Sequence, residues 1–289
     1  MQSSSPMLPA SAPLSASAVQ SASATQSASA PPLVSAPLSA SATLSASATL
    51  SASATLSAPT TTAPSQKEES HSSRKGRIVA VEGNIASGKT TFLNYFQKYN
   101  NVKVFPEPVD KWKDVRGYNA LDLLYKDTKR WSCPFEFLVT LSLLENHRTA
   151  QSQPGVKLLE RSVYSTRHCF MEYLSNSDQL HAMDHSILTD CHTWLQHSED
   201  LHLDLIVYLR ASPEVCAERM RIRSRAEETE IPLDYLRALH QLHDDWLLHG
   251  KRGELPAPVL LLDANKSLSD LQRDIDAASQ EILCDHTAS

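Results

Sequence analysis

The sequence has few glycines and, over its first 66 residues, no charged side chain. Only 7 of its 289 residues are glycine, and residues 1–66 contain no aspartate, glutamate, lysine or arginine. Serine, alanine, threonine, proline and leucine dominate this segment, in which TLSASA recurs at Thr43 and Thr49 and, truncated, at Thr55. Such a composition cannot bury enough apolar surface to offset chain entropy. We therefore predict a disordered low-complexity tail over residues 1–74 and one folded domain over residues 75–289.

Cysteines and long apolar runs are also scarce. The 5 cysteines are odd in number and form no C-x-x-C pair, which indicates reduced thiols in an intracellular protein and no zinc site. No run of 18 apolar residues exists, so we expect no membrane span. All 27 basic and 33 acidic residues follow residue 66 and give a net charge of −6, which argues against a general nucleic-acid binder.

The tail leaves the compartment open between cytoplasm and mitochondrion. It is rich in serine and poor in acidic residues, as mitochondrial transit peptides are. It has no arginine before Arg74, although transit peptides normally need arginine. The apolar segment of a secretory signal peptide is also missing. From the missing arginines we expect a reporter fused to the first 80 residues to stay largely outside mitochondria.

A phosphate-binding loop stands near the start of the folded domain. Residues Gly83–Thr90 read GNIASGKT and match G-x-x-x-x-G-K-[ST] at every fixed position. The β-branched run Arg77–Val81 before it predicts a buried strand, and apolar residues at helical spacing in Thr91–Tyr99 predict a helix. Backbone N–H groups of such a loop surround phosphate oxygens at a helix N-terminus. We expect Lys89 to reach the β- and γ-phosphates and the Thr90 hydroxyl to bind Mg²⁺.

The rest of the domain alternates short apolar runs with longer helical patterns. Four further strands are predicted, at Val102–Phe105, Lys157–Leu159, Leu205–Leu209 and Val259–Leu262. Helices are predicted at Phe135–Gln151, Asp184–His197, Pro213–Arg225, Leu233–Leu248 and Leu268–Leu283. The predicted fold class is therefore α/β, with a five-stranded parallel sheet flanked by helices. Ligands are expected beyond the carboxyl ends of its strands.

Charged residues follow two of the predicted strands. Glu107 comes after the second strand, and Pro108 behind it keeps Glu107 out of helical geometry, so that its carboxylate projects from the strand end. Glu160 and Arg161 come directly after the third strand. A phosphate-binding loop beside a carboxylate and an acid–arginine pair suits phosphoryl transfer to a hydroxyl. The carboxylate would accept the hydroxyl proton, and the cations would hold the spreading negative charge.

Arginines alternate along the segment RMRIRSRAEE, at Arg219, Arg221, Arg223 and Arg225. At i, i+4 spacing they predict two adjacent basic stripes at the end of a helix. A charge run is usually a solvated helix face, here balanced by Glu227 and Glu228. Beside a phosphate-binding loop, we favour a lid that covers phosphates.

Six motifs, in their order and spacing, resemble the deoxyribonucleoside kinase family: GNIASGKTT, EPVDKW, LLYKDTKRW, ERSVYSTRHCF, DLIVYLRASPE and RIRSRAEE. The resemblance covers about Ile78 to the C-terminus and is greatest to the thymidine-type members, which include a mitochondrial enzyme, and to the multisubstrate members. It implies a P-loop kinase with an arginine-rich lid. It also implies ATP- and Mg²⁺-dependent phosphorylation of the 5′-hydroxyl of deoxyribonucleosides, a step of nucleotide salvage, by a homodimer.

The resemblance implies a role for each matching residue. Glu107 resembles the base that deprotonates the 5′-hydroxyl, Arg161 the arginine that holds that oxygen, and Glu160 a magnesium-linked acid. Together with Lys89 and the lid arginines Arg223 and Arg225, Glu107 and Arg161 form the expected catalytic set. The other substrate positions are Tyr125 and Glu228 for the sugar 3′-hydroxyl, Phe170 for stacking on the base, and Trp112 as a pocket wall.

ATP is expected on two loops of the predicted sheet. The first is the phosphate-binding loop with the residue after it: Gly83, Asn84, Ile85, Ala86, Ser87, Gly88, Lys89, Thr90 and Thr91. The second follows the last strand, and its residues Asp263, Ala264 and Asn265 are expected to border the adenine.

Several positions depart from the family pattern. Glu136 stands where the family has a base-reading glutamine. Thr166 replaces the alanine of thymidine-type members or the aspartate of deoxycytidine- and deoxyguanosine-type members, and Leu143 replaces an arginine of the latter. These two changes argue against a deoxycytidine-type pocket. Glu136 either is protonated and imitates glutamine, or shifts preference toward guanine, or points out of the pocket. His168 replaces a usual tyrosine.

Other functions stay open at this point. A nucleoside monophosphate kinase shares the loop and the lid but binds a second phosphate on its acceptor. A catalytically weak nucleoside-binding P-loop protein is a second alternative because of Glu136. A regulatory GTPase would need a guanine-reading N-K-x-D motif, which the sequence NKSL at residues 265–268 does not match.

Overall fold

The computed structural model describes residues 76–228 and 231–283, where a five-stranded sheet forms the framework. Its strands are β1 (Arg77–Glu82), β2 (Val102–Phe105), β3 (Val156–Glu160), β4 (Leu205–Arg210) and β5 (Val259–Asp263). The strand order is β2-β3-β1-β4-β5 and every pairing is parallel. The predicted five-stranded parallel sheet is confirmed. The tail predicted for residues 1–74 lies outside the described residues.

Helices connect the strands. They are α1 (Lys89–Phe96), α2 (Val109–Lys113), α3 (Ala120–Lys126), α4 (Thr128–Gln151), α5 (Val163–Ser165), α6 (Met171–Asn176), α7 (Ala182–Ser198), α8 (Pro213–Arg223), α9 (Leu233–Leu247) and α10 (Leu268–Leu283). A π-helical turn, η1 (Thr166–Phe170), joins α5 to α6, and a 3₁₀ turn, η2 (Ala226–Glu228), follows α8.

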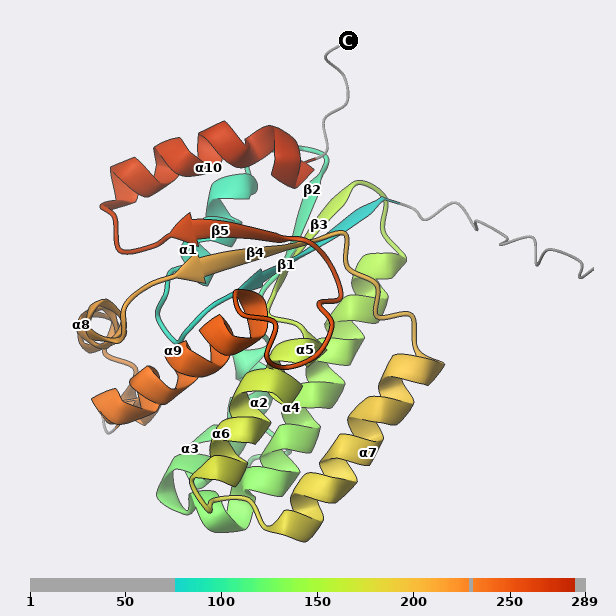
Figure 1. Cartoon of the computed structure of the whole chain (residues 1–289), viewed down its shortest axis with the longest axis vertical. Helices are drawn as coiled ribbons and strands as arrows, with labels where there is room; N and C mark the ends of the chain where they lie inside the picture. Colours follow the sequence, from blue (N-terminus) through green and yellow to red (C-terminus); the bar gives the residue numbers. More distant parts are fainter. Residues whose placement is uncertain (1–75, 229–230, 284–289) are drawn as a thin grey trace, which may run out of the picture. The chain divides into compact units, whose positions relative to one another are not determined.

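Alternate residues of the central strand β1 pack on opposite faces of the sheet. Val79 and Val81 belong to a core with side chains of α1, α8 and α10. Ile78 and Ala80 belong to a second core with side chains of α4, η1 and α9. Figure 1 shows α10 and α9 on opposite sides of the sheet. Burial on both faces explains why the strands read as continuous apolar runs.

A helical layer lies beside the sheet and carries a core of its own. Side chains of α2, α3, α4 and α7 pack around Trp112, Phe135 and Leu143. Figure 1 shows these helices grouped with α6 at one end of the molecule's described part. Two of them begin at side-chain caps, since Asn119 accepts from the Asp122 N–H at 3.0 Å and Asp127 from the Arg130 N–H at 3.2 Å.

Several predicted helix boundaries are wrong; α1, for example, spans Lys89–Phe96 instead of Thr91–Tyr99. Helix α4 begins at Thr128 instead of Phe135 and runs through Pro134, because the Asp127 cap and packing against α3 hold the first turns despite the missing N–H. Helix α8 ends at Arg223 instead of Arg225, because Ser224 turns left-handed with φ 52°. Arg221 and Arg225 therefore do not form the predicted stripe.

Within residues 76–228 and 231–283, no helix combines the length and the apolarity needed to cross a membrane.

Candidate active site

The loop Gly83–Gly88 joins β1 to α1, as predicted, and two of its residues need glycine. Gly83 has φ 143° and Gly88 has φ 109°, both in the left-handed region. A Cβ on Gly83 would lie 2.6 Å from the Leu209 carbonyl oxygen, so the loop passes close against the end of β4. Gly88 is the N-cap of α1, and the loop therefore presents N–H groups at a helix N-terminus.

Lys89 is buried beneath this loop. Its Nζ donates to the carbonyl oxygens of Asn84 at 2.9 Å and Gly83 at 3.2 Å. Burial, and then the positive charge of Arg161, lower the pKa of Lys89 to about 8, while nearby carboxylates oppose the shift. The ammonium is thus held at the centre of the loop where phosphate oxygens are expected.

The Asn84 side chain has a structural role within the phosphate-binding loop. Asn84 donates from Nδ2 to the Leu236 carbonyl at 2.8 Å and accepts from the Ile85 N–H at 2.8 Å, so its side chain ties the loop to α9. The Ile85 N–H is therefore occupied, and the Ser87 N–H donates to the Asn84 carbonyl at 3.2 Å, so both groups would exchange these contacts to meet phosphate. Thr91 is exposed on the first turn of α1.

The predicted magnesium residues are in contact. The Thr90 hydroxyl donates to Glu160 at 2.9 Å to one carboxylate oxygen and 3.1 Å to the other. A hydroxyl and a carboxylate are hard oxygen ligands, and magnesium sites commonly combine one or two carboxylates with waters and phosphate oxygens. The two side chains therefore fit a magnesium ion shared with a phosphate. Among the described residues, no cluster of three or more histidine, cysteine, aspartate or glutamate side chains offers a metal site made by protein alone.

Glu107 and Arg161 meet beyond the ends of β2 and β3. Glu107 Oε1 lies 2.8 Å from Arg161 Nε. Arg161 is almost fully buried and Glu107 is 18% exposed, so the carboxylate keeps access to solvent or substrate. Burial alone would lower the pKa of Arg161, but Glu107, Glu82 and Glu160 raise it above its usual range. The guanidinium is therefore a permanent cation among three carboxylates.

Arg161 is held in an unusual backbone geometry. Its φ of 65° lies in the left-handed region, which side chains other than glycine rarely adopt. Its guanidinium stacks over the Phe170 ring with the central carbon 4.6 Å from the ring centroid. Nη1 is buried and makes no hydrogen bond with the described residues. Arg161 thus combines an unusual backbone geometry with a buried donor that has no partner among the described residues.

Sequence reasoning missed Glu82, the last residue of β1. It is fully buried, and the Ser162 hydroxyl donates to it at 2.6 Å. Burial raises its pKa to about 7, although the charges of Arg161 and Lys89 and the serine hydrogen bonds oppose the rise. The only signal in the sequence was an acidic residue directly before the phosphate-binding loop.

The two arginines predicted to form a lid, Arg223 and Arg225, contact Glu228, the acid predicted to bind the sugar. Arg223 hydrogen-bonds Glu228, and Arg225 Nη1 donates to Glu228 at 3.2 Å. Burial, followed by the negative charges of Glu228 and Glu107, raises the pKa of Tyr125. Arg221 pairs with the exposed Glu218 and is directed away from this group.

The residues expected at the base end lie on α4, η1 and α2. Glu136 and Thr166 are buried, and the Thr166 hydroxyl donates to the Val163 carbonyl at 2.7 Å. Trp112 is also buried, with its indole N–H on the Ser142 hydroxyl at 2.9 Å. Leu143, which replaces a family arginine, is buried in the helical core. Among the described residues, no ion pair involves Glu136.

The loop expected to border adenine follows β5. The Ala264 N–H donates to the Arg210 carbonyl at 2.9 Å, and Asn265 Oδ1 accepts from the Ser212 N–H at 2.7 Å. Asp263 accepts from Asn265 Nδ2 at 2.8 Å. These contacts fix the loop to the carboxyl end of β4, which pairs directly with β1, the strand that leads into the phosphate-binding loop.

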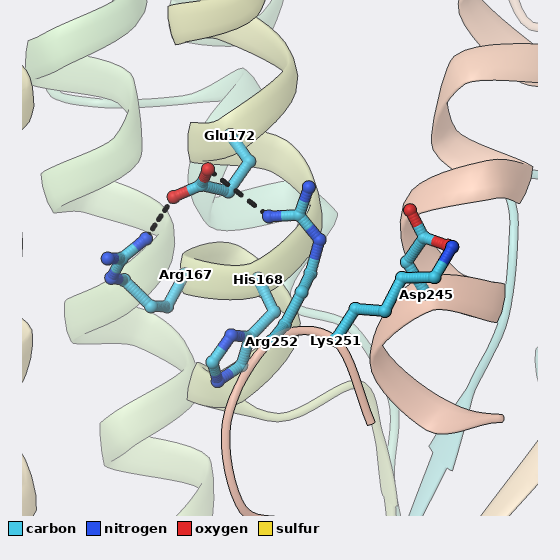
Figure 2. A pocket seen from close by; sticks show the side chains of 6 residues that line it. All are labelled: Arg167, His168, Glu172, Asp245, Lys251 and Arg252. Carbon is cyan, nitrogen blue, oxygen red and sulfur yellow. Dashed lines mark hydrogen bonds and ion pairs between the residues drawn. The ribbon is translucent and has the colours of Figure 1, made fainter. Parts of the chain in front are cut away.

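His168 belongs to a different surface. A pocket beside η1 and the segment after α9 is lined by Arg167, His168, Glu172, Asp245, Lys251 and Arg252. In Figure 2, Glu172 lies between Arg167 and Arg252 and pairs with both. His168 stacks on Trp246 with ring centroids 5.2 Å apart. The replacement of a family tyrosine at this position therefore does not enter the group around Glu107.

A parallel α/β sheet, a phosphate-binding loop and an acid–arginine pair at the strand ends define the class of P-loop phosphotransferases. The deoxynucleoside kinase family model matches residues 79–285. Mitochondrial thymidine kinase 2 of Homo sapiens is 43% identical over 220 residues, which cover 76% of this chain and 82% of that protein. Deoxycytidine kinase of Mus musculus is 35% identical over 249 residues, which cover 76% of this chain and 95% of that protein.

The chain belongs to the deoxynucleoside kinase family. It is a kinase that phosphorylates deoxynucleosides for salvage, with ATP as the phosphate donor.

Proposed function

We propose that Glu107 is the general base of this reaction and that Arg161 holds the attacking 5′-oxygen. The observation that carries the proposal is the contact of 2.8 Å between the two side chains beyond the ends of β2 and β3. Glu107 is partly exposed and can accept a proton, while Arg161 has a donor without a partner among the described residues. A hydroxyl seated between them would lose its proton to Glu107 as it attacks phosphorus.

The remaining cations stabilise the phosphates. Lys89 exchanges its loop carbonyl contacts for β- and γ-phosphate oxygens, which are stronger acceptors. Arg223 and Arg225 form the lid over the transferred group, and Glu228 positions them while it binds the sugar 3′-hydroxyl with Tyr125. Thr90 and Glu160 would hold Mg²⁺, which neutralises charge on the β- and γ-phosphates when bound.

The acceptor is assigned by a direct assay. The protein, ATP and Mg²⁺ are incubated with each of the four deoxyribonucleosides and, separately, with the corresponding monophosphates, and products are separated by mass. We expect 5′-monophosphates from nucleosides and no diphosphates from monophosphates. Diphosphates as the main product would assign a monophosphate kinase, and binding without turnover would assign a nucleoside-binding protein.

Helices α4 and α7 carry a stripe of exposed apolar side chains that suits a second copy of the chain. Leu141, Met183, Ile187 and Trp194 are 55%, 65%, 44% and 60% exposed. Three of them lie at i, i+4 and i+11 on one side of α7. We propose a homodimer through this face. Sedimentation equilibrium should give twice the chain mass, and Trp194→Arg should give a monomer; a monomeric wild-type protein would overturn the proposal.

The compartment is open between cytoplasm and mitochondrion. The similarity to a protein named mitochondrial thymidine kinase 2 favours the mitochondrion, and the lack of arginine in the first 73 residues favours the cytoplasm. A fluorescent reporter fused to residues 1–80 decides between them by co-localisation with a mitochondrial dye.

A further inference from the structure

Glu82 is a buried acid to which the proposed reaction gives no role. It is the last residue of β1 and is fully buried, and its Oε2 makes no hydrogen bond with the described residues. Burial of a carboxyl group costs free energy, because the protein replaces only part of its lost hydration. An unfavourable group of this kind is commonly kept for a function.

Two hydrogen bonds connect the end of β1 to the residues that follow β3. The Arg161 N–H donates to the Val81 carbonyl at 3.0 Å, and the Ser162 hydroxyl donates to Glu82 Oε1 at 2.6 Å. The parallel register, in which Val81 lies opposite Glu160, brings the two segments together. The first bond therefore holds the main chain of Arg161, and the second holds the residue directly after it.

The contact between Glu82 and Ser162 lies next to the left-handed turn at Arg161. Arg161 has φ 65°, whereas Ser162 is extended at φ −133° and is the N-cap residue of α5. A side chain other than glycine keeps a left-handed conformation only where surrounding contacts hold it. Loss of the contact would let this turn relax, and the Arg161 guanidinium would then move relative to Glu107.

Glu82 also contributes negative charge beside two buried cations of the site. Burial raises its pKa to about 7, although the positive charges of Arg161 and Lys89 and the serine hydrogen bonds oppose the rise. Burial and the charge of Arg161 lower the pKa of Lys89, and Glu82 is one of three carboxylates that oppose this. An ionised Glu82 therefore offsets the repulsion between the two cations.

The other titratable groups next to Glu82 carry no positive charge. Burial, followed by the charge of Glu82, raises the pKa of the Cys169 thiol of η1, so this thiol is neutral. On β4, Tyr208 lies opposite Glu82 in the sheet register, and its hydroxyl donates to Asp244 at 2.7 Å. Arg161 and Lys89 are thus the cations that compensate Glu82 among the described residues.

We propose that Glu82, in its ionised form, is a positioning residue that holds the phosphate-binding loop and Arg161 at a fixed spacing. Its main chain leads directly into Gly83 of the loop, and its side chain holds Ser162 behind Arg161. The inference rests on the proposed function, because it takes Arg161 as the group that holds the 5′-oxygen. Phosphoryl transfer depends mainly on positioning and charge neutralisation, so a small displacement between loop and arginine lowers the rate.

Two variants separate the charge of Glu82 from its hydrogen bond. Glu82→Gln keeps an acceptor for Ser162 and removes the charge, and we expect kcat at about pH 8 to fall about 10- to 100-fold. Ser162→Ala keeps the charge and removes the hydrogen bond, and should lower kcat about tenfold. KM for the nucleoside should stay nearly constant in both, because the positioning acts in the transition state.

Ser132→Ala is the matched control for these kinetics. Ser132 is also buried and donates one hydrogen bond, to the Gln179 carbonyl at 2.9 Å, but it lies on α4 outside the catalytic group. This variant should keep the wild-type kcat. A wild-type kcat in either Glu82→Gln or Ser162→Ala would overturn the proposal.

A double-mutant cycle with Arg161→Lys separates this inference from the proposed function. If Glu82 acts through Arg161, Glu82→Gln should cost less than about threefold in the Arg161→Lys background. A full loss there would show that Glu82 acts independently of Arg161 and would overturn the inference. Wild-type activity of Arg161→Lys itself would instead contradict the proposed role of Arg161. If Glu82→Gln does not fold, the same cycle with Ser162→Ala decides.

Thermal unfolding tests the buried charge without catalysis. The pKa of Glu82 is about 7 in the folded protein against an ordinary 4.5. Between these values the folded chain keeps a proton that the unfolded chain releases, so this group's contribution to the free energy of unfolding falls as pH rises. The Tm of Glu82→Gln minus that of the wild type should therefore increase from about pH 5 to about pH 8, while kcat of the variant stays low. A Tm difference that does not change with pH would show that Glu82 carries no buried charge and would overturn the proposal.

Discussion

Glu107 and Arg161 are 2.8 Å apart although 54 positions separate them in the chain (161 − 107). The parallel pairing of β2 with β3, in which Phe105 lies opposite Leu159, brings the two strand ends together. Glu107 follows one strand and Arg161 the other, so the sheet register sets their spacing. Because Arg161 is buried and Glu107 is partly exposed, the pair combines a fixed cation with a carboxylate that can take up a proton.

Arg161→Lys should lower kcat while the protein stays folded. A lysine keeps the charge but loses the planar guanidinium that stacks on Phe170 and whose Nε lies 2.8 Å from Glu107. We expect a loss of about 10²–10³ in kcat, the cost of removing one donor that stabilises a developing negative charge. Steady-state kinetics and circular dichroism measure the two effects. Arg221→Lys, on the exposed side of α8, is the control and should be neutral. Equal activity of both variants would remove Arg161 from the reaction.

Thr90→Val should raise the Mg²⁺ concentration needed for half-maximal activity. The substitution keeps the shape of the side chain and removes the hydroxyl that contacts Glu160. We expect at least about a tenfold increase, since altered ligand shells commonly cost that much in metal affinity. Thr90→Ser, which keeps the hydroxyl, should behave as the wild type. Titrations of activity against Mg²⁺ at saturating ATP give the comparison, and an unchanged midpoint for Thr90→Val would assign the metal to other groups.

His243→Phe should make the protein more resistant to mild acid. His243 is fully buried, and burial followed by the charge of Arg161 lowers its pKa from 6.5 to about 3. Below pH 6.5 the unfolded chain therefore takes up a proton that the folded one refuses, and the free energy of unfolding falls as pH falls. The loss is about 1.4 kcal/mol per pH unit for one such group. Thermal unfolding at pH 7.5 and 5.5 should show a smaller drop in Tm for the variant, whereas parallel drops would place the acid sensitivity elsewhere.

Removal of residues 1–74 should leave catalysis and thermal stability unchanged. The expectation comes from composition, because a segment dominated by serine and alanine contributes little apolar surface to a core. Truncated and full-length proteins are compared in kcat and Tm under identical conditions. A large fall in Tm on truncation would show that the tail packs on the domain.

The sheet was predictable because its three central strands, β1, β3 and β4, are buried on both faces and read as largely apolar runs with clear ends. The edge strands β2 and β5 are partly exposed but are also short, mainly apolar runs. The phosphate-binding loop has a fixed spacing, so its residues were found without a structure. Helices α2 and α3 were not predicted, since they are short and their stability comes from packing around Trp112. The predicted start of α4 at Phe135 was wrong, because the Asp127 cap and tertiary packing keep the turns before Pro134 helical.

Within the site, residues that follow strands were easier to predict than residues inside them. Glu107 and Arg161 stood out as charges after apolar runs. Glu82 was missed because it ends β1 inside the run, where only the structure reveals a buried acid bonded to Ser162. The pairing of Arg223 and Arg225 with Glu228 could not be foreseen either, because it depends on the left-handed turn at Ser224.

The assignment of Glu107 as general base is tested most directly by Glu107→Gln, which keeps the shape and removes the basicity. Single-turnover phosphorylation of the best deoxyribonucleoside is measured together with nucleoside affinity by calorimetry. The account predicts that the rate falls by roughly 10²–10⁴ while nucleoside binding persists. A variant that turns over at nearly the wild-type rate would contradict the account and place the base elsewhere.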